Sequence, residues 1–184
     1  MRIERTNLDG VMLLTPRRFG DARGFFAETW NARVFAEAGI EATFVQDNHS
    51  VSDAVGTLRG LHYQAPPDAQ GKLVRCGRGH LFDVALDLRR GSATYGEWTG
   101  HDLSAENGRM LWIPEGFAHG FVTRAPGTEI VYKCTGFYAP GAEGAVRWDS
   151  CGIDWGLIGA PLLSEKDAAA PPLARVAAPF GADA

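Results

Sequence analysis

Apolar and polar residues alternate with a period of two along much of the chain, and glycine or proline interrupts the pattern at short intervals. In residues 81–88 the even positions are apolar, whereas Asp83 and Asp87 fall on the opposite strand face, which we expect to be polar or wet. Residues 128–134 alternate in the same way and place Tyr132 on an apolar face. Short alternating runs between glycines and prolines are typical of an all-β sandwich or barrel.

Two further segments carry clear local signals. The Asp9-Gly10 turn predicts a pair of edge strands within residues 2–15. Residues 31–39 have an apolar stripe with helical spacing, Asn31 to cap the start and Gly39 to end it, so they predict the one clear helix. The length of 184 residues suffices for one domain with a sizeable core. We predict a single domain over 1–184, whose Ala- and Pro-rich tail over 168–184 is partly mobile.

Two glycine-bounded segments, residues 56–64 and 108–123, each carry a histidine in or beside an apolar run. A histidine in such a place satisfies a core contact, binds a metal or transfers a proton. From its surroundings alone, His119 is interpreted most simply as a core histidine. His62 differs because Arg59 and Gln64 give it polar neighbours that a core histidine rarely needs.

The spacing of glycine, proline and histidine in these segments resembles the two signatures of the cupins, which are double-stranded jelly rolls. Many cupins bind a metal through three histidines and a glutamate. Here Gln64 stands at the second histidine position, and no glutamate follows at the expected spacing. Two histidines without a nearby carboxylate make a poor divalent site, although Gln64 can still be a weak ligand. We therefore expect a cupin barrel that has kept its pocket and lost its metal.

Basic residues near His62 suggest a local anion site. They are Arg59, Lys72 and Arg75, with Arg23 further upstream. Arginine and lysine suit phosphate oxygens, but for any single arginine a solvated surface ion pair is the simpler interpretation. On a regular strand Arg59 and His62 face opposite ways, so a bulge at Gly60 is needed to bring them to one face.

Bulk properties limit the partners and the compartment. The net charge of −4 gives no global attraction to nucleic acid or to a membrane. The three cysteines show no CxxC spacing, which favours a reducing compartment. The first residues are charged and no apolar run reaches membrane-spanning length, so we expect a cytoplasmic protein.

Long stretches of the chain resemble the dTDP-4-dehydrorhamnose 3,5-epimerase family, the metal-free cupins of rhamnose synthesis. The matching stretches are FGDARGFFAETW, FVQDNHSVS, LRGLHYQ, QGKLVR, FDVALDLR, LSAENGRMLWIPEGFAHGFV, EIVYK and SEKDAAAP. The resemblance implies a jelly roll, usually a homodimer in which N-terminal strands extend the partner's sheet. It implies a deoxythymidine diphosphate (dTDP) 4-keto-6-deoxyglucose substrate, inverted at carbons 3 and 5 next to the ketone.

The resemblance also implies roles for particular residues. His62 is expected to be the base, with Asp167 fixing its tautomer, and Tyr132 the acid on the opposite face of the sugar. Lys72 is expected to stabilise the enolate. The residues expected to bind substrate are Arg23, Glu28, Gln46, Asp47, Asn48, Arg59, Lys72, His119, Tyr138, Glu143 and Lys166. Tyr138 would stack on thymine, and Arg23 and Glu28 would serve the partner's site.

Other interpretations stay open at this point. Taken alone, Tyr132 fits a core tyrosine, Lys72 a surface lysine and Asp167 the start of a helix. Relatives within the family invert one centre or shift a ketone instead. A metal-dependent cupin enzyme and a non-catalytic nucleotide-sugar binding module are the rival classes.

Overall fold

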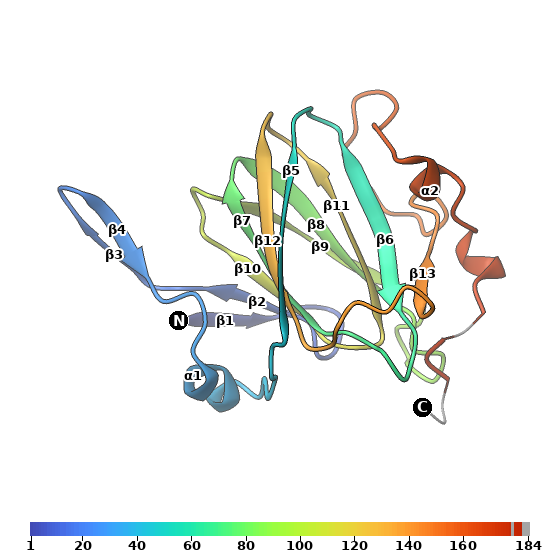
Figure 1. The fold of residues 1–184 in the computed structure, drawn as a ribbon, viewed down its shortest axis with the longest axis horizontal. Helices are drawn as coiled ribbons and strands as arrows, with labels where there is room; N and C mark the ends of the chain where they lie inside the picture. The colour runs from blue at the N-terminus through green and yellow to red at the C-terminus, as the bar shows by residue number, and fades with distance from the viewer. Residues whose placement is uncertain (178, 182–184) are drawn as a thin grey trace.

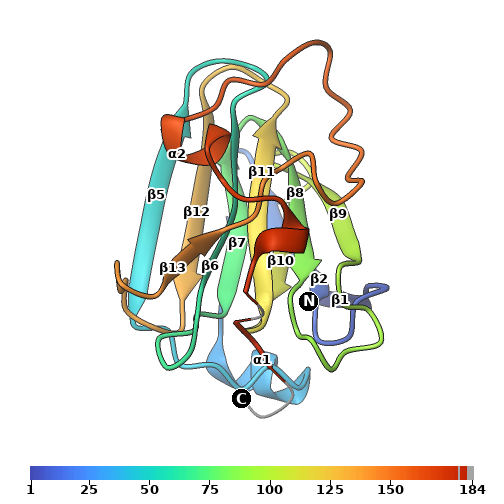
Figure 2. The same cartoon turned by 90° about the vertical axis from the view of Figure 1, so that its right-hand side faces the viewer.

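The computed structural model describes residues 1–177 and 179–181, which form two antiparallel β-sheets packed face to face (Figure 1 and Figure 2). In spatial order, the larger sheet contains β1 (Arg2–Arg5), β2 (Met12–Thr15), β10 (Met110–Ile113), β7 (Lys72–Arg78), β12 (Thr128–Cys134) and β5 (Gln46–Ser52). The smaller sheet contains β13 (Glu143–Ala145), β6 (Leu58–Gln64), β11 (Phe117–Thr123), β8 (His80–Asp87) and β9 (Trp98–Ser104). The predicted all-β jelly roll is confirmed.

Helices are few and short. The predicted helix is present as α1 (Ala32–Glu37), and the Asn31 side chain caps it by accepting hydrogen bonds from the amides of Arg33 and Val34. Gly39 follows its end with a φ of 83°, a left-handed value that favours glycine. The other helices are α2 (Glu165–Ala168) and the 3₁₀ turn η1 (Leu173–Arg175). In the part of the chain that the structure covers, no helix is long and apolar enough to cross a membrane.

Alternation along the strands of the smaller sheet builds an apolar layer on each of its faces. Between the sheets lies a cluster that includes Val74, Leu81, Leu111 and Ile130. On the far side of the smaller sheet, a second cluster packs under the C-terminal segments, with Trp155 and Phe180 among its members. Fully burying side chains of this size stabilises the fold by about 1.5–3 kcal/mol each, so the two layers hold the sheets rigidly around the barrel interior.

The face of β8 that carries Asp83 and Asp87 is partly polar but not wet, and Leu81 and Ala85 on the same face belong to the apolar cluster between the sheets. Both carboxylates are fully buried because this face points into the barrel rather than into solvent. The opposite face of β8 is also covered, by the second apolar cluster. The pattern correctly separated the two faces, but alternation does not distinguish water from a polar interior.

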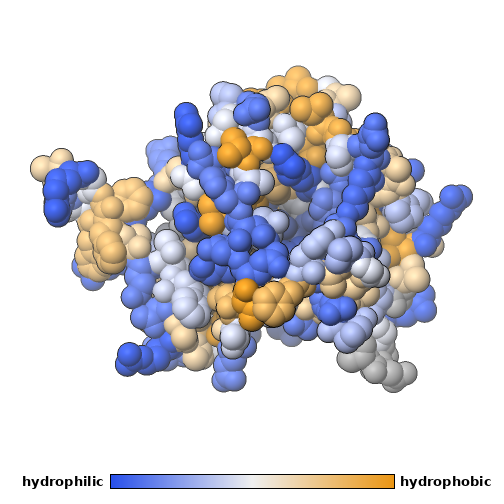
Figure 3. Space-filling model, in the orientation of Figure 1, coloured by the Kyte–Doolittle hydropathy of each residue, from blue (hydrophilic) through white to orange (hydrophobic). Residues whose placement is uncertain are grey.

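The hairpin of β3 (Arg18–Asp21) and β4 (Gly24–Ala27) projects away from the barrel, at the left of Figure 1. It exposes Phe19, Phe25 and Phe26 at 51%, 59% and 69% of their surface. Figure 3 shows apolar colour along this arm and hydrophilic side chains at its tip. An exposed aromatic arm of this kind typically packs against another protein surface.

The predicted mobile tail falls partly on residues 178 and 182–184, which lie outside the described residues. Within the described part, Ala170 and Phe180 are buried, and Arg90 donates a backbone hydrogen bond to Phe180. The mobility of the tail stays a prediction.

Candidate functional site

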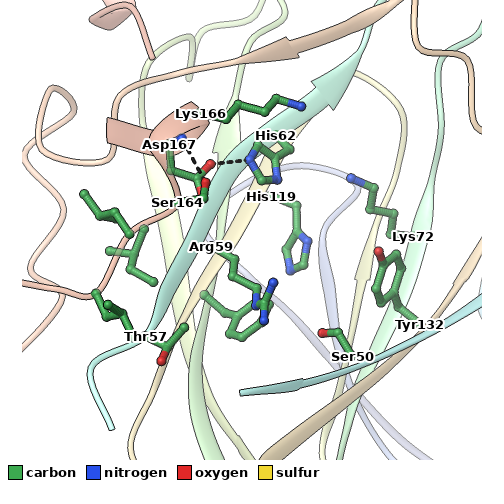
Figure 4. A pocket seen from close by; sticks show the side chains of 14 residues that line it. Ser50, Thr57, Arg59, His62, Lys72, His119, Tyr132, Ser164, Lys166 and Asp167 are labelled. Carbon is green, nitrogen blue, oxygen red and sulfur yellow. Dashed lines mark hydrogen bonds and ion pairs between the residues drawn. The ribbon is translucent and has the colours of Figure 1, made fainter. Parts of the chain in front are cut away.

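A cavity of about 580 Å³ opens into the barrel between the two sheets and beside α2. Its walls come from β5, β6, β7, β11 and β12, together with the segment that leads into α2. Its lining is Ser50, Thr57, Leu58, Arg59, His62, Lys72, His119, Phe121, Tyr132, Leu162, Leu163, Ser164, Lys166 and Asp167 (Figure 4). Residues far apart in the sequence thus meet in one place.

His62 is held by Asp167, which is buried at the start of α2. Nε2 of His62 lies 2.5 Å from Oδ1 of Asp167, and Ser164 Oγ donates to Oδ2 at 2.9 Å. Burial acts to raise the pKa of Asp167, but hydrogen bonds from His62 and Ser164 outweigh it, so its pKa lies below the usual value. Asp167 therefore stays a carboxylate at neutral pH. Its bond to Nε2 fixes the imidazole ring and leaves Nδ1 for a ligand.

A bulge in β6 brings Arg59 to the same cavity as His62. His119 on β11 pairs with His62, but Phe121 pairs with Arg59, so two residues of β6 lie opposite the single Gly120 of β11. Gly60 lies in the bulge, where an added Cβ would stand 2.5 Å from the backbone of Gly120. The expected irregularity at Gly60 is confirmed.

Lys72 and Tyr132 occupy the wall opposite His62, on the neighbouring strands β7 and β12 (Figure 4). Burial lowers the pKa of Lys72, and the nearby Cys134, Asp83 and Glu143 offset part of this effect. Burial raises the pKa of Tyr132, so its hydroxyl keeps its proton at neutral pH. The wall thus presents the amine of Lys72 and the protonated hydroxyl of Tyr132 to the space in front of His62.

A second cavity of about 310 Å³ shares His62, Lys72 and Tyr132 with the first. The residues that line it beyond these three are Gln46, Asn48, Tyr63, Gln64, Gln70, Tyr138 and Glu143. The two cavities form one elongated site with His62, Lys72 and Tyr132 at the junction. Such a shape suits a ligand with a reactive head and a long polar tail.

An ion pair lies between the two cavities. Lys166 Nζ is 2.5 Å from Glu143 Oε1, and the Tyr138 hydroxyl donates to Glu143 Oε2 at 3.0 Å. The hydrogen bond from Lys166 is the main reason why the pKa of Glu143 is lowered. Because Lys166 is half exposed, this pair is worth at most about 1 kcal/mol, and another anion can readily replace Glu143 beside Lys166.

His119 forms a second histidine–carboxylate pair in the same site. Its Nε2 lies 2.7 Å from Oδ1 of Asp83 on β8, and both side chains are buried. His119 was predicted as a site residue from the sequence, whereas Asp83 was not. The available signal was Asp83's place on the polar face of an otherwise apolar strand.

Three predicted binding residues lie outside the cavity of their own chain. Arg23, at the tip of the β3–β4 hairpin, is 90% exposed and pairs with Asp21. Glu28 is exposed just after the hairpin. Asp47 alternates with Gln46 and Asn48, so it faces outward, where Lys133 Nζ lies 3.0 Å from it.

Gln64 is fully engaged by backbone groups. Its Nε2 donates to the carbonyls of Asp68 and Phe137, and its Oε1 accepts from the amide of Ala139. Gln64 therefore ties two loops together instead of presenting a free ligand atom. Across residues 1–177 and 179–181, no group of three or more His, Cys, Asp and Glu side chains is placed to hold a metal ion.

The jelly roll, with a cavity that opens between its two sheets, defines a cupin-like protein. The chain belongs to the dTDP-4-dehydrorhamnose 3,5-epimerase family, whose model matches residues 5–175, and the members of this family are isomerases. Two similar proteins carry that family name. The protein from Pseudomonas aeruginosa is 56% identical over 170 residues, covering 91% of this chain and 93% of its own. The protein from Salmonella typhimurium is 53% identical over 174 residues, covering 93% and 94%.

A solved structure has the same architecture throughout. It is the dTDP-6-deoxy-D-glucose-3,5-epimerase of Legionella pneumophila in complex with dTDP-4-keto-L-rhamnose. The TM-score is 0.93 with 45% identity, and the match covers 97% of this chain and 96% of that one. At this similarity the likeness extends to the fold as a whole.

Proposed function

We propose that this protein inverts carbons 3 and 5 of dTDP-4-dehydro-6-deoxy-D-glucose to give dTDP-4-dehydro-L-rhamnose, without a cofactor. Membership of the family supports this reaction. The observation that carries the proposal is the single site in which the His62–Asp167 pair faces Lys72 and Tyr132. A base on one side of a sugar ring and an acid on the other are what inversion next to a ketone requires.

His62 is the base in this proposal. The ketone at carbon 4 acidifies the hydrogens on carbons 3 and 5, so a neutral imidazole can remove them. Asp167 accepts from Nε2–H and stabilises the imidazolium that forms when Nδ1 takes the proton. A positioned base of this kind contributes about 10²–10⁴-fold to the rate.

Lys72 stabilises the negative charge that develops on the oxygen at carbon 4. A fixed donor inside a site that excludes water is worth about 3 kcal/mol at an oxyanion. Tyr132 then gives its proton to the opposite face of the ring, which completes the inversion. Its buried hydroxyl suits this role because its raised pKa keeps it protonated.

The nucleotide part of the substrate occupies the second cavity. Tyr138 offers a flat ring for the thymine, while Gln46 and Asn48 offer amides to the polar groups of the nucleoside. Arg59 and Lys166 meet the diphosphate, which displaces Glu143 from Lys166. His119 contributes to binding the sugar.

We infer that the enzyme works as a homodimer. The projecting hairpin, with its exposed aromatic residues, supports a role as an arm on a second copy. On such an arm Arg23 and Glu28 reach the partner's cavity, which accounts for their distance from their own. The three free cysteines suit a reducing compartment, so we place the enzyme in the cytoplasm.

Incubation of the keto-sugar nucleotide with the enzyme in deuterated water tests the reaction. The proposal predicts deuterium at carbons 3 and 5, observed by NMR, and the same rate after treatment with a chelator. Label at one carbon alone indicates a single-centre epimerase. Thermal stabilisation by the nucleotide without any label indicates a binding module.

A further inference from the structure

Asp83 is a buried carboxylate with only half of its hydrogen-bonding capacity used. Its exposure is 0%, and Oδ1 lies 2.7 Å from Nε2 of His119. Its Oδ2 is the one buried side-chain oxygen or nitrogen without a partner among the residues that the structure describes. A carboxylate taken out of water is costly unless its charge is compensated.

Asp87, on the same face of the same strand, shows how this chain otherwise stabilises such a group. Its carboxylate accepts hydrogen bonds from Arg89, Ser92 and Thr94, and the arginine is a permanent counter-ion. Asp83 has no comparable set. Among the described residues, the ion-pair partner of Asp83 is His119.

Other charged or titratable groups surround the Asp83–His119 pair, but none of them takes the place of His119 as the ion-pair partner of Asp83. They are His62 and Arg59 on β6, Lys72 and Cys76 on β7, His101 on β9 and Tyr132 on β12. Burial lowers the pKa of His101, and its Nε2 is bonded to Thr99 Oγ1 at 3.0 Å, so this ring is not a cation at neutral pH. The charge of Lys72 influences Asp83, but the two do not form an ion pair.

We propose that Asp83 is a positioning residue that keeps His119 protonated, so that His119 acts beside Lys72 as a second cationic donor to the oxyanion at carbon 4. This inference rests on the proposed epimerisation. His119 is the direct cross-strand neighbour of His62, and Figure 4 shows it between the His62–Asp167 pair and the Lys72–Tyr132 wall. With Asp83 bonded to Nε2, the protonated ring offers Nδ1–H to the cavity.

Two cations at this position have a clear chemical use. Proton removal from carbon 3 and from carbon 5 places negative charge on the same oxygen. A second donor at that oxygen therefore lowers both barriers together, whereas a donor to a distant hydroxyl would mainly affect substrate binding. The separation of kcat from KM distinguishes these two roles.

The charge of His119 is measured first, by ¹⁵N NMR of the histidine side chains in the wild-type protein without substrate. The inference predicts an imidazolium at neutral pH for His119, and a neutral ring in Asp83→Asn. A neutral ring in the wild-type protein overturns the inference. This measurement does not depend on the reaction, so it fails independently of the proposed function.

Kinetics of Asp83→Asn, His119→Gln and the double variant then test the role. We expect kcat to fall by about 10²-fold for each single variant, with little change in KM and equal losses of deuterium exchange at carbons 3 and 5. Because the two residues act as one unit, the double variant should lose no more than His119→Gln. Additive losses, or a change confined to KM, contradict the inference.

Asp87→Asn is the matched control because it removes a second buried carboxylate from the same strand. It should lower the melting temperature without changing kcat or the isotope pattern. If Asp83→Asn does not fold, Asp83→Glu replaces it: the retained charge predicts a protonated His119 and a larger kcat than in any folded neutral variant. A neutral His119 in Asp83→Glu would count against the inference.

Discussion

Nε2 of His62 lies 2.5 Å from Oδ1 of Asp167, although 105 positions separate the two residues in the chain. The contact exists because Ser164 caps α2: its hydroxyl accepts a hydrogen bond from the backbone amide of Asp167. This cap places the Asp167 carboxylate against β6. Leu58 and Leu162 anchor the approach to α2 through a backbone hydrogen bond of 3.0 Å. The orientation of the proposed base thus depends on a short helix at the far end of the sequence.

Asp167→Asn should lower kcat strongly and leave KM nearly unchanged. The amide can donate to Nε2, which favours the wrong tautomer, and it cannot stabilise the imidazolium. We expect a loss of about 10²–10⁴-fold in steady-state assays. Ser164→Ala removes one hydrogen bond to the carboxylate and the cap of α2 but keeps the His62–Asp167 pair, so it should cost far less. Equal kcat values for Asp167→Asn and the wild-type enzyme would show that the pair is merely structural.

Deprotonation of Lys72 should determine where activity falls on the alkaline side, or limb, of the pH profile. Burial disfavours its charged form and lowers its pKa, and the proposed role needs that charged form. Activity should therefore be lost with rising pH at a pH below about 10.4, the ordinary pKa of a lysine side chain. Tyr132 is not the cause of this limb because burial raises its pKa.

Lys72→Arg is the matched variant for this profile. A guanidinium stays charged throughout the range, so the residual activity of the variant should no longer fall along the same limb. An unchanged limb in Lys72→Arg would assign it to a different group.

Tyr132→Phe should separate proton removal from inversion. Without the acid on the opposite face, His62 can still remove and return a proton. We therefore expect deuterium exchange to persist at whichever of carbons 3 and 5 reacts first, while product formation falls by about 10²-fold or more. NMR of a single reaction in deuterated water measures the two rates together. Parallel loss of exchange and turnover would argue against Tyr132 as the acid.

If the β3–β4 hairpin of each subunit completes the partner's site, two impaired variants should complement each other in a mixed dimer. Arg23→Ala lacks the arm residue and His62→Ala lacks the base, so each homodimer should have impaired sites. A mixed dimer restores one site with both residues, so an equal, randomly reassembled mixture should recover about a quarter of wild-type activity. Mixing without recovery would place Arg23 outside the partner's site.

Local patterns were sufficient to predict the all-β class and several elements, whereas the jelly roll itself was implied by the resemblance to the cupins. Alternation identified β8 and β12, the Asp9-Gly10 turn identified the β1–β2 pair, and Asn31 and Gly39 bounded α1. Each of these signals acts within a few residues, where strand pleat, turn geometry or capping determines the conformation.

The site was harder to predict because it depends on contacts across the sheets. The bulge that aligns Arg59 with His62 arises from the close approach of β6 and β11, and only the need for it was visible beforehand. Asp83 was assigned to a polar face without its partner His119. The family resemblance supplied Asp47 as a binding residue, whereas simple alternation turns it away from the cavity.

Solvent labelling by His62→Ala tests the central claim most directly. The variant would be incubated with the keto-sugar nucleotide in deuterated water and followed by NMR, after its fold and its nucleotide binding have been verified. Because one imidazole is proposed to take both protons, we predict no enzyme-dependent deuterium at carbon 3 or at carbon 5. Normal labelling of either carbon would contradict the assignment of His62 as the base.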